Sequence, residues 1–216
     1  MKSPFIFIAS LLLLSACAAP QTPAAALLDI EPTATTAPTP TPFPMENGIF
    51  TGQPDDFLLT EEELVGAYEA DGAGSGSTNM DLLQARADGE AYIEATGRLM
   101  GWRIQFNRAG EGDTPPYVVN VVNMYEHAEG AQLVLNREWH QDVWSAIDSG
   151  QLTLLPEIEG LDAEHLIWQT AEGAVGVELV YRNLYILFTG PGDGVDQYEF
   201  FAELARTHLQ WIRDGE

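Results

Sequence analysis

The chain has 216 residues, 45% of them hydrophobic, which is enough for one globular domain with a substantial core. It carries 33 acidic and 9 basic residues, a formal net charge of -24. A field of that sign repels phosphate backbones and anionic lipid headgroups, which argues against nucleic-acid binding and against a body lying flat on a membrane. The simplest interpretation is a solvated surface that resists aggregation; a specific acidic recognition face is the alternative.

The N-terminus has the pattern of an export signal. Lys2 precedes an apolar run at residues 5–14, which is too short for a comfortable transmembrane helix. The sequence Leu-Ser-Ala-Cys follows directly at residues 14–17. Cys17 is the only cysteine, so no intramolecular disulfide can form and the hydrophobic core alone must hold the domain.

Residues 14–17 resemble the bacterial lipobox, Leu-[Ala/Ser]-[Gly/Ala]-Cys. The resemblance implies cleavage before Cys17, a diacylglyceryl thioether on its sulfur and acylation of the new N-terminus, because stable anchoring needs more than one acyl chain. The alternative is an ordinary cleaved signal peptide with a chance cysteine. Ala18, where the family rule would otherwise look for aspartate, implies that transfer to an outer membrane is permitted. We expect a lipid anchor in the cell membrane or the outer membrane, on the extracytoplasmic side.

The anchor is followed by a spacer. Residues 18–44 are rich in Ala, Thr and Pro, and residues 33–44 read TATTAPTPTPFP. Each proline blocks helix and sheet hydrogen bonds and favours extended geometry, which predicts a semi-rigid stalk. We therefore divide the chain into a signal peptide at 1–16, a lipidated cysteine with a disordered stalk at 17–44, and one acidic domain at 45–216.

The first part of the domain predicts two helices. Thr60 and Glu63 have capping-box spacing, which indicates a helix over residues 60–70. Residues 71–78 (DGAGSGST) predict a flexible loop. A second helix is expected over residues 81–95, where Asp88 could cap a restart and Gly97 stands at the position of a C-terminal glycine.

The middle of the domain predicts a hairpin and a long helix. Residues 98–108 alternate from Trp102 on, and residues 117–125 are rich in strand formers, so the two segments should pair. Residues 126–147 carry an apolar stripe at three- and four-residue steps, which indicates a helix. Residues 149–162 are expected to be a connector.

The last part predicts three strands, at residues 165–170, 175–182 and 184–189, with Asn183 in a tight turn. A helix over residues 195–213 ends the chain. The order is α-α-β-β-α-β-β-β-α, and the short links imply an antiparallel sheet of about five strands. We predict an α+β fold with helices packed on one face, the other face being partly open or covered by the N-terminal helices.

Three segments suggest a family. Residues 97–102 (GRLMGW), residues 180–188 (VYRNLYILF) and Ala205-Arg206 resemble a group of uncharacterised secreted bacterial lipoproteins. The layout is similar to the α/β/α shape of the PsbP/Mog1-like fold, which hosts binding and scaffold roles. The resemblance carries over no catalytic residues, and fold likeness is not function.

The serines, acids and histidines of the sequence do not form a recognisable catalytic motif. Ser75 and Ser77 lie in GAGSGS, which is not the G-x-S-x-G elbow of serine hydrolases, and a flexible loop explains them better. Glu138, His140 and Asp142 point to different sides of a helix and do not converge. No two histidines have the i, i+4 spacing of a zinc site; the chain has His127, His140, His165 and His208.

Two glycine loops carry carboxylates, Glu111 with Asp113 and Asp193 with Asp196. Calcium needs six to eight oxygen ligands and neither loop has EF-hand spacing. The second pair more simply favours the N-terminus of the last helix. We expect no metal site and no cofactor; a glycosidase pair of acids cannot be recognised among so many.

The tryptophans give the contact candidates. Trp102, Trp139 and Trp168 fit the apolar faces of their elements. Trp144 and Trp211 lie beside the apolar stripes of their helices, so both are candidates for contact with a ligand or partner.

These patterns predict a monomeric, non-enzymatic envelope lipoprotein. Its domain would bind an unknown protein or a small apolar ligand between sheet and helices, and Cys17 would hold it on the membrane. Two alternatives remain: an extracytoplasmic hydrolase that uses acidic residues, and a structural or sensory module without a ligand.

Overall fold

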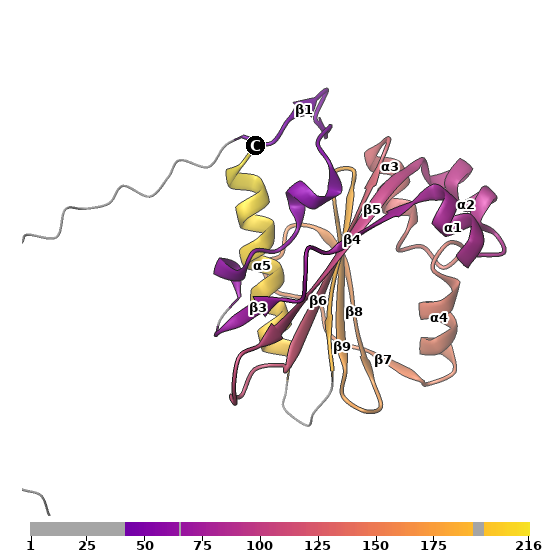
Figure 1. The fold of residues 1–216 in the computed structure, drawn as a ribbon. Helices are drawn as coiled ribbons and strands as arrows, with labels where there is room; N and C mark the ends of the chain where they lie inside the picture. The colour runs from indigo at the N-terminus through magenta and orange to yellow at the C-terminus, as the bar shows by residue number, and fades with distance from the viewer. Residues whose placement is uncertain (1–41, 65, 192–196) are drawn as a thin grey trace, which may run out of the picture. The chain divides into compact units, whose positions relative to one another are not determined.

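The computed structural model describes residues 42–64, 66–191 and 197–216. Within these ranges the main feature is an antiparallel sheet of eight strands beside a separate two-stranded hairpin (Figure 1). The hairpin is formed by β1 (Met45–Glu46) and β2 (Ile49–Phe50). The order across the large sheet is β3 (Tyr68–Ala70), β5 (Arg98–Arg108), β6 (Tyr117–Tyr125), β10 (Leu184–Gly190), β9 (Val175–Tyr181), β8 (Glu164–Thr170) and β7 (Leu152–Leu154), and β4 (Ser75–Thr78) also pairs with β5. The α+β class is confirmed, but the sheet is larger than the five strands predicted.

The predicted strands form as expected. β5 and β6 pair as a hairpin, and β8, β9 and β10 follow one another as antiparallel neighbours. The alternation in β5 is confirmed, because Trp102, Ile104 and Phe106 all belong to or pack against one core. β10 joins the two halves by pairing with β6.

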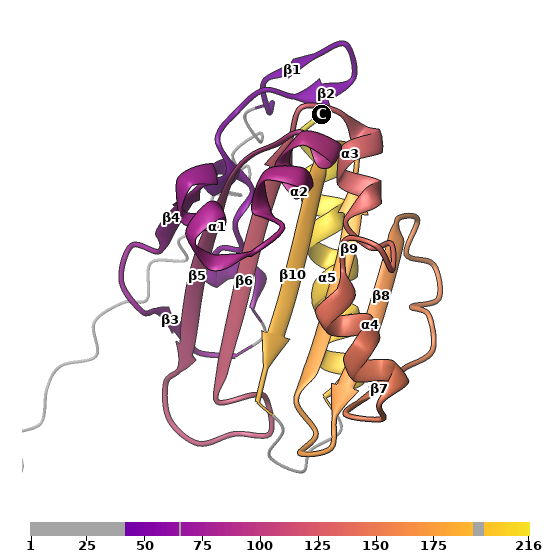
Figure 2. The ribbon, with the colours of Figure 1, turned by 90° about the vertical axis from the view of Figure 1, so that its right-hand side faces the viewer.

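Helices lie on both faces of the sheet, and the second face is covered in part by α2 (Gly89–Thr96), which comes from the N-terminal helical region, as one of the predicted alternatives had it. On one face α5 (Tyr198–Asp214) packs its buried residues on the larger core. On the other face α2, α3 (Ala128–Leu133) and α4 (Gln141–Asp148) cover a smaller core (Figure 2). β9 is therefore buried on both sides from Val175 to Val180, and each large apolar side chain so buried contributes about 1.5–3 kcal/mol.

The second face remains partly open over β5, β6 and β10, as one of the predicted alternatives had it. Tyr117 is 38% exposed there, and it lines a hollow of 590 Å³ with Arg103, Val121 and Leu187. The helices on this face crowd over β8, β9 and the upper ends of the central strands instead (Figure 2).

The helix predicted over residues 60–70 is wrong. The chain forms two short 3-10 turns, η1 (Pro54–Phe57) and η2 (Glu61–Glu63), and then enters β3. The predicted capping box exists, with the Thr60 N–H donating to Glu63 Oε2 at 2.8 Å, but it caps a single turn. Gly66 at φ +113° interrupts the helical path, and β3 finds its hydrogen bonds on β5.

The glycine-serine segment is not a loop throughout, because residues 75–78 form β4 on the edge of β5. A Cβ on Gly76 would lie 2.9 Å from the Trp102 ring, so a glycine is needed where that ring crosses the strand. The next predicted helix is split into α1 (Asn79–Ala85) and α2, with Asp88 at the start of α2. Gly97 ends α2 at φ +63°, as predicted.

The helix predicted over residues 126–147 is also split. Turns at residues 134–140 separate α3 from α4, and the connector contains β7. A tertiary contact lies at this break. His140, which precedes α4, contacts Glu178 on β9 at 2.6 Å. α5 begins at Tyr198, and the earlier start at residue 195 falls outside the described residues.

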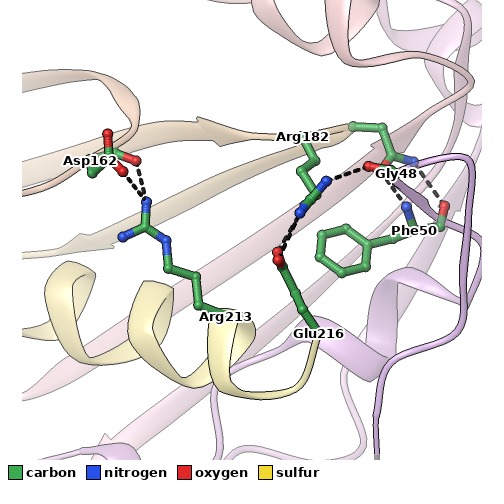
Figure 3. A network of polar contacts seen from close by, with 7 residues as sticks. Gly48, Phe50, Asp162, Arg182, Arg213 and Glu216 are labelled. Atoms are coloured by element: carbon green, nitrogen blue, oxygen red, sulfur yellow. Dashed lines mark hydrogen bonds and ion pairs between the residues drawn. The ribbon is translucent and has the colours of Figure 1, made fainter.

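The first described residues lie beside the end of the chain (Figure 3). The Phe43 N–H donates to the Gly215 carbonyl at 2.6 Å, and Arg182 makes a two-point ion pair with Glu216 and a bond to the Gly48 carbonyl. Asn183 lies in the turn between β9 and β10, as predicted. Its buried amide bonds both backbone groups of Phe50, and the positive φ of the turn, +53°, belongs to Arg182.

Candidate functional site

A cleft between α4 and the β7–β8 edge of the sheet is the most ligand-like feature of the domain. Its volume is 390 Å³, within the range of small-molecule sites. It lies on the second face, where α4 covers the β8–β9 half of the sheet (Figure 2). Its apolar wall on that face contains Leu135, Trp144, Leu154 and Leu166, and the cleft also borders Leu155 and Ile167 of the larger core.

Trp144, a predicted contact residue, is half-buried in this wall and held in place. Its indole N–H donates to the Leu135 carbonyl at 2.9 Å. The Arg137 guanidinium lies 4.4 Å from the ring centroid, and Arg137 is itself paired with Asp148 at 2.7 Å. The ring is thus oriented by a hydrogen bond and covered on one side by a cation.

The mouth of the cleft combines exposed apolar surface with free charge. Leu154 is 48% exposed and lines the cleft, so apolar surface is accessible at its mouth. Glu157 and Glu164 line the mouth, and neither has an ion pair within the described part of the chain. An apolar wall with a few polar groups at its edge is the usual composition of a binding site.

Trp211, the other predicted contact residue, lies on the opposite face of the sheet, so the two tryptophans do not form one site. Its ring stacks on His208 at 5.3 Å and meets Phe43 edge-on at 5.0 Å. It also lines an open groove of 620 Å³ along α5, with Glu62, Asp162, Arg206 and Arg213 among its neighbours. These ring contacts give Trp211 a packing role in addition to any contact with a partner.

A buried carboxylate lies under α4 and was not predicted. Glu178 is 1% exposed, and it accepts hydrogen bonds from Trp168 Nε1 and His140 Nε2, both at 2.6 Å. These two hydrogen bonds partner both carboxylate oxygens, which is the condition for keeping a carboxylate inside a protein.

Three histidines are held by specific hydrogen-bond partners. His165 lies with Nδ1 2.8 Å from the Ala163 carbonyl and accepts the Ile158 N–H at Nε2. His208, fully buried, has an acceptor beside each ring nitrogen, the Glu63 carboxylate and the Phe57 carbonyl. His140 donates to Glu178 from Nε2. The exposed His127 lies near Glu126.

Burial shifts the titration of several groups near Glu178. Burial raises the pKa of Tyr185 well above its ordinary value, and the Glu178 charge adds to the effect. Burial also raises the pKa of Tyr125, which shares a hydrogen bond of 2.9 Å with Tyr92. Burial lowers the pKa of Arg98, which is 4% exposed.

The motif residues behind the family resemblance have structural roles. Arg98 bonds the side-chain oxygens of Asn79 at 3.0 Å and Asn123 at 2.9 Å, joining α1 to the central strands. A Cβ on Gly101 would overlap Asn123 and Arg98, so glycine leaves room for that bond. Arg182 and Asn183 hold the N-terminal hairpin, as described above.

The remaining predicted chemistry does not assemble. Ser75 and Ser77 lie on edge strand β4, and the Ser77 hydroxyl accepts from Arg98. Within the described ranges no three His, Cys, Asp or Glu residues gather as a metal site would require. Cys17 and the pair Asp193 and Asp196 lie outside the described residues.

Comparisons with known proteins add little. No protein-family model matches the chain, and no curated protein matches it. Among solved structures, the extracellular domain of PknH from Mycobacterium tuberculosis is similar, with a TM-score of 0.43 and 13% identity over 74% of this chain and 94% of that one. At that level the likeness assigns neither a family nor a function. None of the helices in residues 42–64, 66–191 and 197–216 has the length and apolar character needed to cross a bilayer.

Sequence reasoning singled out Trp144 as a contact candidate, and it named no other residue that lines the cleft for that role. Trp144 was singled out because it leaves the apolar stripe of its helix, and the cleft is what lies beside it. The two leucines at residues 154 and 155 fell in a segment predicted as a connector. Their only signal was two neighbouring apolar residues before Pro156, outside any amphipathic pattern.

Proposed function

We propose that the protein is a lipid-anchored extracytoplasmic binding module. The domain takes a ligand with an apolar part into the cleft between α4 and the β7–β8 edge. The observation that carries this proposal is a cleft of 390 Å³ whose apolar wall contains the half-buried Trp144. Leu154 is exposed at the mouth of this cleft. The lipobox at residues 14–17 and the proline-rich stalk support the anchoring and the location.

The same residues support a role without catalysis. A general acid in a glycosidase is a carboxyl shielded from water, whereas Glu157 and Glu164 at the cleft mouth are both exposed. Glu178 is shielded, but its two oxygens are already bonded to Trp168 and His140. The hydrolase alternative would need one of these carboxyls to be both buried and free.

Native mass spectrometry of the full-length protein purified from its own host tests the proposal. We expect a bound small molecule in the wild type, lost on Trp144→Ala. Trp211→Phe, on the opposite face, is the matched control and should retain the molecule. The proposal fails if the wild type carries nothing, or if Trp144→Ala carries the same molecule in the same amount.

A further inference from the structure

The charges at the mouth of the cleft are unequal, and they indicate what kind of ligand it accepts. Arg137 supplies the only positive charge among the lining residues, and Asp148 compensates it at 2.7 Å. Glu157 and Glu164 supply two negative charges that no described cation compensates. The net charge at the mouth of the cleft is therefore negative.

The other titratable group in the lining cannot offset these charges. Both nitrogens of His165 are engaged with backbone groups, at 2.8 Å to Ala163 and 2.9 Å to Ile158. Nε2 accepts the Ile158 N–H and Nδ1 faces a carbonyl, so neither nitrogen is directed at Glu157 or Glu164. The charge of the whole chain, -24, has the same sign as the mouth and draws cations toward it.

Trp144 offers a surface suited to a cation. The Arg137 guanidinium already lies over the ring at 4.4 Å from its centroid, which is the geometry of a cation–π contact. Arg137 and Asp148 are both mostly exposed, with side-chain exposures of 62% and 59%, so the guanidinium can leave the ring at small cost. The internal arginine thus occupies the place that a charged ligand group would take.

We propose that the cleft selects an organic cation, an aliphatic or aromatic group joined to an ammonium or guanidinium. This inference rests on the proposed function and adds the ligand class. The apolar group packs against Leu135, Leu154 and Leu166, which lie on the same face of the sheet as Trp144. The cationic group lies between the Trp144 ring and the carboxylates of Glu157 and Glu164. An anionic ligand would meet two uncompensated negative charges at the same place.

Three probes with one phenyl group and different head charges test the proposal: 2-phenylethylamine, 2-phenylethanol and 3-phenylpropanoate. The protein is the mature chain, residues 17–216, with Cys17→Ser. Binding is followed by the shift of the Trp144 indole N–H signal in NMR spectra, assigned with Trp144→Phe. Ligands of this size bind with dissociation constants of about 1 mM. We expect the amine to bind about tenfold more tightly than the carboxylate, with the alcohol between them, and salt to narrow the difference.

Two variants test whether the charged residues at the mouth of the cleft cause the preference for the amine. The double variant Glu157→Gln with Glu164→Gln should weaken amine binding about fivefold and leave the alcohol unchanged. Glu111→Gln with Glu172→Gln changes the net charge equally at residues outside the cleft lining and is the control. Arg137→Ala should strengthen amine binding, because it frees the ring and removes a positive charge.

The outcomes separate this inference from the proposed function. If all three probes shift the Trp144 signal with equal affinity, or the carboxylate binds best, the cleft binds ligands but the cation selectivity is wrong. If none of the probes shifts the signal, the inference is overturned. The proposed function then depends on the protein purified from its host, and an empty cleft there would overturn it as well.

Discussion

At the scale of single residues, close packing and hydrogen-bond completion decide which side chains are tolerated. Gly176 shows this most directly, because the Trp168 ring lies across it on the strand pair β8–β9. The ring is held there by its bond to Glu178. The strand residue under it must therefore have no side chain.

Gly176→Ala should lower the free energy of unfolding by about 1–3 kcal/mol, because the new methyl group overlaps the Trp168 ring and a packed core cannot absorb it. Gly112→Ala is the control, since a Cβ there makes only ordinary contacts with Arg108 at 3.7 Å. Urea unfolding of both variants measures the difference. Equal stabilities for the two would show that Trp168 is not fixed over the strand.

The buried tyrosines predict sensitivity to alkaline pH. Burial raises the folded-state pKa of Tyr125 and Tyr185 above the ordinary value of 10.0, so above that pH the unfolded chain has released protons that the folded protein still holds. The contribution of these tyrosines to the free energy of unfolding is therefore fully present below pH 10 and is lost as the pH rises beyond it. Urea titrations at a series of pH values should show this slope, and Tyr185→Phe should make it shallower. A slope that the variant leaves unchanged would contradict the assignment.

At the scale of elements, buried ion pairs and backbone bonds attach short segments that have little structure of their own. His208 on α5 bonds Glu63 at 2.7 Å and the Phe57 carbonyl at 3.0 Å. These bonds join η1 and η2 to the last helix. The two turns are too short to be stable alone, so their position depends on this contact.

His208→Leu should destabilise the protein by about 3–5 kcal/mol, because it leaves the Glu63 carboxylate buried without its imidazole partner. Adding Glu63→Leu should recover part of that loss, since the unpaired charge is then gone. A double-mutant cycle from urea unfolding measures the coupling. If the losses of the two single variants simply add, the pair is not a unit.

The N-terminal hairpin is attached by the network around Arg182. The hydrogen bonds from Arg182 lower the pKa of Glu216, so this contribution to stability is present at neutral pH and is lost as pH falls through the folded-state pKa. The pair is partly exposed, which predicts a small change in global stability for Glu216→Gln. Hydrogen exchange should instead show faster exchange at Phe50 than in the wild type, with Val177 in the core unchanged.

At the scale of the whole molecule, the two faces of the sheet have different tasks. The face under α5 holds the larger core and the attachment of the first described residues. The face under α4 holds the cleft and a buried polar network around Glu178. In our proposal one face holds the domain together and the other binds the ligand.

The proposed anchor gives a prediction for the full chain. Cys17→Ser should move the protein from the membrane fraction to the soluble extracytoplasmic fraction, because the variant has no thiol to carry the lipid. Mass spectrometry of the wild type should find a diacylglyceryl group on the first residue of the mature chain. An unmodified wild-type mass, or equal fractionation of the two proteins, would exclude the anchor.

The sequence by itself determined the parts of this protein that depend on near neighbours in the chain. Alternation marked β5 and β9, an apolar stripe marked α5, and the capping residues Thr60 and Gly97 stand at real element ends. Each of these signals arises from periodicity or from a hydrogen bond within a few residues. Such signals depend only on neighbouring residues, so they can be recognised without knowledge of the rest of the fold.

Tertiary structure alone decided the rest. The bond from His140 to Glu178, 38 residues away, accompanies the break in the predicted helix, and pairing with β5 turned a glycine-serine segment into a strand. The cleft needs residues from α4 and from both β7 and β8, so no local pattern contains it. These features depend on the free energy of contacts between distant segments, and that free energy outweighs local propensity where the two conflict.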